Sequence, residues 1–160
     1  MNATIDVTVE IVNASTDTQL PSSTDFRHWT TATLTALEAA GDMPLPEETE
    51  LCIRVVDEAE SAQLNENYRH KPGATNILSF PFNGIHGTAI NLLGDLAICA
   101  PLVKREAREQ HKTAQAHWAH LTVHGVLHLN GYDHEEPAAA EQMEALEIRI
   151  LDTLGFGNPY

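Results

Sequence analysis

The stretch "TIDVTVEIV", residues 4–12, alternates apolar and polar side chains without a fault, which predicts a half-buried strand. Beyond it, the apolar period lengthens from Ser23 to Ala40, where Phe26, Trp29, Leu34 and Leu37 fit one face of a helix. A second strand, "ELCIRVV", is expected at residues 50–56. A strand, a helix and a strand at this spacing favour a right-handed parallel crossover, so the chain begins as a layered fold.

The rest of the chain predicts two more strands and four more helices. The strands are expected at 77–82 and 94–100, and the helices at 58–69, 101–112, 114–130 and 137–154. Pro81 cannot donate to a strand ladder, so its strand should lie at a sheet edge. The last helix should face the core with Met143, Leu146, Ile150 and Leu154, and the solvent with Glu141, Glu144 and Glu147. Residues 1–160 are therefore expected to form one α+β domain with α/β-type layers, a small mixed four-stranded sheet covered by about five helices.

The charge of the chain is strongly acidic, with nine basic and 23 acidic residues and a formal net charge of −14. This disfavours a nucleic-acid binder, because phosphate contacts come mainly from Lys and Arg. However, seven of the nine basic residues lie between Arg54 and Lys112. Among them, Lys104, Arg105, Arg108 and Lys112 recur at helical spacing, which predicts one local basic face.

The sequence also bears on the location of the protein. No apolar run approaches the length needed to cross a bilayer, and "MNATIDVTVE" lacks the basic region and apolar core of a signal peptide. The two cysteines, Cys52 and Cys99, are too few for a disulfide scaffold. We therefore expect a cytoplasmic protein that does not associate with membranes.

Three histidines stand close together in "HGVLHLNGYDH", residues 124–134. His124 and His128 lie one turn apart on the same face of the predicted helix. Gly131 can end that helix in a left-handed conformation, so that the chain turns back and His134 reaches the same point. Three imidazoles with a fourth position open to water are typical of a catalytic zinc site, so we predict a metal centre here.

One zinc ion is the expected cofactor, although neutral imidazoles also suit Ni, Cu or Fe. Zinc in such a site lowers the pKa of its bound water to about 7 and so supplies a nucleophile at neutral pH. A buried helix with merely hydrogen-bonded histidines is the competing interpretation, and the glycine at the turn disfavours it. His117 and His120, on the same stripe, are expected at the helix surface or behind the metal ligands.

The histidine spacing resembles the zinc signature of metzincin peptidases, with one departure. That signature carries a glutamate, the general base, directly after the first histidine, and Gly125 occupies this position here. A peptidase is therefore disfavoured. Asp133 and Asp95 are the carboxylates considered as a general base, and the sequence does not decide between them.

Three segments together resemble the bacterial YbeY family of metal-dependent, single-strand-specific endoribonucleases. They are "LNENYRHKPGATNILSFPF" (64–82), "LLGDLAICA" (92–100) and "HWAHLTVHGVLHLNGYDH" (117–134). The resemblance spans roughly residues 50–155, and the first 45 residues share only the strand–helix pattern. It implies metal ligation by His124, His128 and His134, and a functional role for Arg69.

The resemblance further implies cleavage of single-stranded RNA, maturation of the 3′ end of small-subunit ribosomal RNA, and ribosome quality control. The ribosome and ribosomal proteins are the implied partners. Arg69 can make a bidentate contact to phosphate, and Phe80, Phe82 or Tyr132 can stack on bases. Two alternatives stay open: a non-catalytic ribosome-assembly factor with a structural metal, and a metal hydrolase of another substrate.

Overall fold

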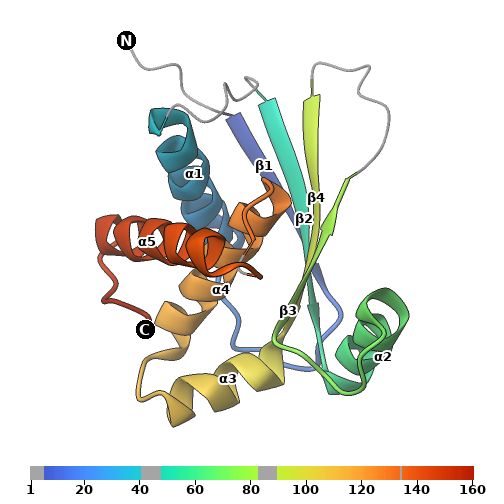
Figure 1. The fold of residues 1–160 in the computed structure, drawn as a ribbon. Coiled ribbons are helices and arrows are strands. Elements are labelled where there is room, and N and C mark those ends of the chain that lie inside the picture. Colours follow the sequence, from blue (N-terminus) through green and yellow to red (C-terminus); the bar gives the residue numbers. More distant parts are fainter. Residues whose placement is uncertain (1–5, 41–47, 83–89, 134) are drawn as a thin grey trace.

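The computed structural model describes residues 6–40, 48–82, 90–133 and 135–160 (Figure 1). These residues form four strands and five helices. They are β1 (Asp6–Asn13), α1 (Ser23–Ala39), β2 (Glu48–Val56), α2 (Glu58–Arg69), β3 (Ile77–Pro81), β4 (Ile90–Cys99), α3 (Ala100–Glu109), α4 (Ala114–Leu129) and α5 (Pro137–Thr153). The predicted α+β class, with its small mixed sheet and about five helices, is confirmed.

The sheet has the strand order β1-β2-β4-β3. β1 pairs parallel with β2 and β2 pairs parallel with β4, whereas β3 runs antiparallel to β4. β3 is an edge strand and ends at Pro81, as expected for a residue that cannot donate to the ladder. β4 begins at Ile90, earlier than predicted, because it continues through Gly94 rather than starting there.

The helices cover the two faces of the sheet unequally. α1, α4 and α5 lie on one face, and α2 covers one end of the other face (Figure 1). The main core lies between the sheet and helices α1, α4 and α5. The strands contribute the fully buried Ile53 and Leu96, and the helices contribute Phe26, Trp118 and Leu127. α4 is therefore held on several sides, and this fixes the helix that carries the histidines.

The predicted basic face of α3 is partly neutralised. Lys104 pairs with Asp17 at 2.6 Å, and Arg105 pairs with Glu58 at 3.4 Å. Lys112 lies beyond the end of α3, and its ammonium nitrogen is buried. Helical spacing places these cations on one face, but acidic residues from distant segments neutralise part of it.

None of the helices that the structure describes is both long enough and apolar enough to cross a membrane.

Gly94 is a residue of β4 at a point where the edge strand β3 passes very close to it. Its φ is +137°, and a Cβ built there would meet the Phe80 carbonyl oxygen at 2.2 Å and the Phe82 nitrogen at 3.0 Å. Because these neighbours are backbone atoms, they cannot move aside without disturbing β3. We predict that Gly94→Ala lowers the free energy of unfolding by about 2–4 kcal/mol, measured by urea denaturation.

Gly73→Ala is the matched control for Gly94→Ala. Gly73 also has a positive φ, +88°, but a Cβ there would meet no atom of the described residues within 4 Å. The control should therefore show only the cost of the left-handed backbone, about 1–2 kcal/mol. Equal losses in the two variants would contradict the steric account of Gly94.

Candidate metal centre

α4 brings two of the predicted metal ligands together. The Nε2 atoms of His124 and His128 are 3.1 Å apart. Two nitrogen ligands of one tetrahedral zinc ion, each about 2.0–2.1 Å from it, would be separated by about 3.3 Å. The observed separation therefore fits two ligands of a single ion. The third predicted ligand, His134, lies outside the described residues.

The end of α4 has the turn that the sequence predicted. The helix ends at Leu129, and Gly131 adopts a φ of +93°. The Gly131 amide donates to the His128 carbonyl at 3.0 Å, and the Tyr132 amide donates to the Leu127 carbonyl at 3.1 Å. These bonds satisfy the last carbonyls of the helix while the chain reverses.

Glu147 on α5 is fully buried, so its predicted place on the solvent side is wrong. Its Oε1 lies 2.7 Å from His124 Nδ1 and 3.2 Å from His120 Nε2, and its Oε2 accepts a hydrogen bond from the Tyr160 hydroxyl at 2.6 Å. Burial raises the pKa of this carboxyl, but its close contacts with His120, His124 and Tyr160 outweigh burial and lower the pKa to about 2. The carboxylate is therefore charged and well supplied with donors.

This carboxylate sets the tautomer of His124. An ionised carboxylate only accepts hydrogen bonds, so His124 Nδ1 must carry the proton. The Nε2 lone pair is then directed toward His128 Nε2. A histidine that donates one ring nitrogen to a carboxylate and offers the other to a metal is the usual arrangement in metal centres.

The structure also contains a second possible arrangement of ligands. His120, His124 and Glu147 offer ligand atoms that all lie within 4.8 Å of one another, so this group could itself hold an ion. The two arrangements share His124; the predicted one adds His128 and His134, and the other adds His120 and Glu147. The 2.7 Å contact between His124 and Glu147 is an ordinary charge-assisted hydrogen bond, which favours the pair with His128.

The expectation of a surface position for His117 and His120 is wrong. They are only 2% and 9% exposed. His117 Nε2 lies 2.7 Å from Glu106 Oε1, and burial lowers the pKa of His117. His120 contacts Glu147 behind His124, which agrees with the other expectation, a place behind the metal ligands.

Arg69 reaches the same cleft as the two histidines. It is the last residue of α2 and is exposed. A cleft of about 440 Å³ is lined by Tyr68, Arg69, Ser79, His124, His128 and Asp133, among others. We call it the metal cleft, after the predicted metal ligands in its lining. Residues from α2, β3, α4 and the turn after α4 therefore meet around one opening.

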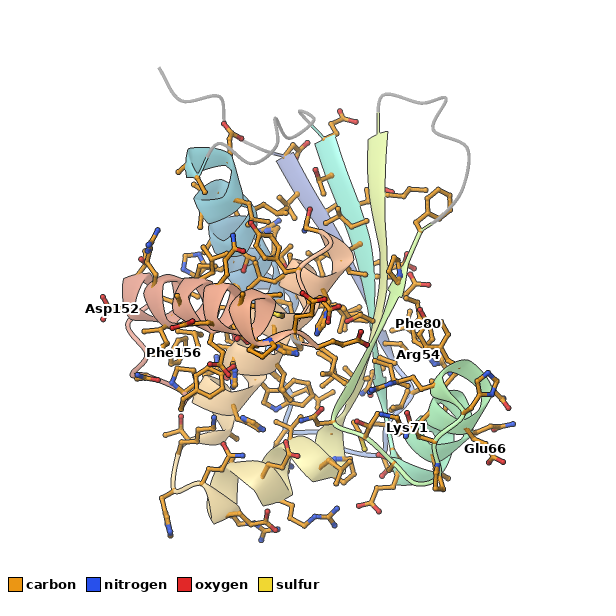
Figure 2. All side chains as sticks on the ribbon, in the orientation of Figure 1. Arg54, Glu66, Lys71, Phe80, Asp152 and Phe156 are labelled. Atoms are coloured by element: carbon orange, nitrogen blue, oxygen red, sulfur yellow. The ribbon has the colours of Figure 1, made fainter. Side chains whose placement is uncertain are left out.

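Asp133 and Asp95, the two carboxylates considered as a general base, lie in different places. Asp133 lines the metal cleft, and its Oδ1 accepts a hydrogen bond from the Glu135 amide at 3.0 Å. Asp95 lines separate clefts with Cys52 and Phe80. Figure 2 shows Phe80 on the α2 side of the sheet. Asp95 is therefore not among the residues that line the metal cleft.

Tyr68 is an aromatic residue of the metal cleft that the sequence analysis missed. It is 49% exposed, and its ring centroid lies 4.5 Å from that of Phe80. Phe80 itself lines the clefts on the other side of the sheet. No spacing rule singles out Tyr68, although it directly precedes Arg69 in the segment that carried the resemblance.

The structure explains why position 125 is a glycine. The helix packs so closely on the sheet that a Cβ there would meet Ile77 Cδ1 at 2.7 Å and Leu96 Cδ2 at 2.8 Å. A glutamate would be forced into the apolar contact between α4 and the sheet. Position 125, which carries the general base in metzincin peptidases, therefore faces the apolar contact with the sheet here, and this agrees with the argument against a peptidase.

Comparison with known proteins gives one consistent result. The profile of the family described as "Endoribonuclease YbeY" matches residues 10–155. Proteins named endoribonuclease YbeY are 52% identical in Nitrosococcus oceani, with 96% of this chain and 97% of the relative covered, and 53% identical in Methylococcus capsulatus, with 98% and 95% covered. The relative in Coxiella burnetii is 48% identical, with 96% and 98% covered. The similarity extends well into the first 45 residues, further than the motifs indicated.

A solved structure supports the fold. The solution structure of TM1509 from Thermotoga maritima matches with a TM-score of 0.56 at 19% identity, and covers 92% of this chain and 91% of that one. At this identity the likeness concerns the fold alone.

Proposed function

The chain belongs to the YbeY family of endoribonucleases, and on that premise we propose that it is a metal-dependent enzyme that cuts single-stranded RNA. We propose His124, His128 and His134 as the ligands of one zinc ion, with nickel as the next candidate, and residues 1–160 as a single endoribonuclease domain. The observation that carries the metal site is the convergence of two Nε2 atoms at 3.1 Å in a cleft that also contains Arg69.

The residues of the cleft have complementary roles in this proposal. A divalent ion at the histidines would activate water and stabilise negative charge at phosphorus. Glu147 orients the His124 ring by accepting a hydrogen bond from His124 Nδ1. Arg69 presents a guanidinium that can bind a phosphate through two hydrogen bonds. Of the two carboxylates considered as a base, only Asp133 lies in the metal cleft.

Arg69→Ala should impair cleavage without removing the metal. A lost charge-stabilising donor of this kind lowers kcat/KM by about 100-fold, because the guanidinium acts on the phosphate and not on the ligands. Cleavage of a fluorogenic single-stranded RNA and metal content would be measured on the same samples. Arg69→Lys, which keeps the charge but loses the bidentate grip, should fall between wild type and Arg69→Ala. Loss of metal in Arg69→Ala would contradict the assigned role.

The finer part of the proposal concerns the biological substrate. We propose that the enzyme acts in the cytoplasm on the 3′ end of small-subunit ribosomal RNA, and in ribosome quality control, with ribosomal proteins as partners. The test is to incubate the metal-loaded enzyme with precursor small subunits and to map the RNA 3′ end. Shortening of the precursor is expected. If the enzyme cuts free RNA but leaves this end unchanged, the maturation role fails while the nuclease remains.

A non-catalytic assembly factor with a structural metal is the alternative function. It would require a metal-loaded protein that cuts RNA no faster than a variant without the metal. The exposed Arg69 in the metal cleft favours the nuclease, because a purely structural ion needs no phosphate-binding side chain beside it.

A further inference from the structure

A second cleft adjoins the metal cleft. It has a volume of about 680 Å³ and is enclosed by the end of α3, by α4 and by the residues after α5. Asn76, Ile77 and His124 line both clefts. The two clefts are therefore direct neighbours, within reach of adjacent nucleotides of one strand.

The polar groups of the second cleft suit a nucleobase. Gln110 and Asn158 supply amide groups, which can donate and accept hydrogen bonds, and Tyr160 supplies an aromatic ring. Glu106 also lines the cleft, and its carboxylate already accepts a hydrogen bond from Asn76 at 3.1 Å and lies 2.7 Å from His117 Nε2. Amides beside an aromatic face are what single-strand binding sites offer to bases.

A phosphate fits this cleft less well. Lys112 is the one lysine or arginine among the described residues that line the cleft, and its ammonium nitrogen is buried rather than presented to solvent. The carboxylate of Glu106 would repel a phosphate, whereas a base is neutral.

Tyr160 is held in place by its hydroxyl while the residue stays open to solvent. The hydroxyl donates to the buried Glu147 at 2.6 Å, and the ring meets the His120 ring edge-on, with centroids 5.4 Å apart and planes at 83°. The residue is nevertheless 61% exposed. A ring fixed in this way loses little freedom when a base stacks on it.

We propose that the second cleft binds the base of an RNA nucleotide next to the one at the metal, with the Tyr160 ring as its stacking platform. The proposal rests on the function proposed above and assigns a substrate subsite to it. Tyr160 contributes to binding through its ring, and the hydroxyl serves to orient that ring.

The test compares Tyr160→Ala with Tyr160→Phe in binding, separately from cleavage. The probe is a fluorescein-labelled eight-nucleotide oligouridylate, and the protein is treated with EDTA so that it cannot turn over. Tyr160→Ala should bind about 5- to 150-fold more weakly than wild type, the range for loss of one aromatic–base stack. Tyr160→Phe lacks the hydroxyl, as Tyr160→Ala does, but it keeps the aromatic ring. It should therefore bind within about threefold of wild type. Thermal unfolding of both variants shows whether the tertiary structure is retained.

A second probe locates the stacked base. A single 2-aminopurine is moved along the oligonucleotide, and its fluorescence should be quenched at one position by wild type and Tyr160→Phe but not by Tyr160→Ala. If Tyr160→Phe binds as weakly as Tyr160→Ala, or if Tyr160→Ala binds like wild type, the stacking platform is overturned. Cleavage is assayed on the same RNA with metal restored. Absence of cleavage alongside the expected binding contrast would refute the nuclease and leave the base subsite standing.

Discussion

His128→Ala is expected to lose both its metal and its RNA cleavage. His128 supplies one of the two Nε2 atoms that converge at 3.1 Å, and the proposed three-histidine site would not hold its ion firmly with one ligand removed. Cleavage should fall by about 1,000-fold or more, because activation of water depends on the ion. Metal content after gel filtration and single-turnover cleavage of a single-stranded RNA would be measured on the same preparation. His28→Ala, an exposed histidine on α1, is the matched control and should behave like wild type.

His120→Ala turns this prediction into a choice between the two possible ligand sets. If the ion is bound by His124 and His128, His120→Ala should keep its metal, and His128→Ala should lose it. If the ion is bound by His120, His124 and Glu147, the pattern should be reversed. A protein in which His128→Ala retains metal at full stoichiometry would therefore refute the assigned site and place the ion in the alternative group.

Local patterns predicted much of the fold and part of the site. Strict alternation identified β1, and the limited donor capacity of proline placed β3 at the edge. The spacing of His124 and His128 specifies that they share a helix face, and this needs no knowledge of the rest of the chain. The left-handed Gly131 followed from the same local logic.

The remaining features depend on how distant segments pack. Glu147 was expected in solvent because carboxylates are usually exposed, although its spacing from Met143 and Ile150 puts it on their face of α5. The packing of α5 against α4 buries that face, and the donors that meet the carboxylate come from outside α5. Similarly, nothing local shows that Lys104 will meet Asp17, or that Arg69 and Tyr68 will share a cleft with His128. These contacts join residues far apart in the chain, and spacing along a single helix carries no information about them.

Glu147→Ala should weaken metal binding although Glu147 is not a proposed ligand. The carboxylate holds His124 by its Nδ1 proton, and loss of such an orienting partner lowers metal affinity by about 10- to 100-fold. The variant also leaves donors on His124 and Tyr160 without their acceptor, so the free energy of unfolding should fall by about 3 kcal/mol. Competition with a chromophoric chelator measures the affinity, and urea denaturation measures the stability.

Glu147→Gln separates orientation from packing. The amide keeps the volume of the side chain and one acceptor oxygen, so stability should fall by only about 1 kcal/mol. The metal affinity should still fall several-fold, because a neutral amide holds the His124 proton less strongly than a carboxylate does. Glu144→Gln, an exposed position on the same helix, removes the same charge away from His124 and should leave both quantities unchanged. If Glu147→Gln binds metal as tightly as Glu144→Gln, the charge on Glu147 contributes nothing to the ligand beside it, and the burial of this carboxylate would serve the packing of α5 on α4 alone.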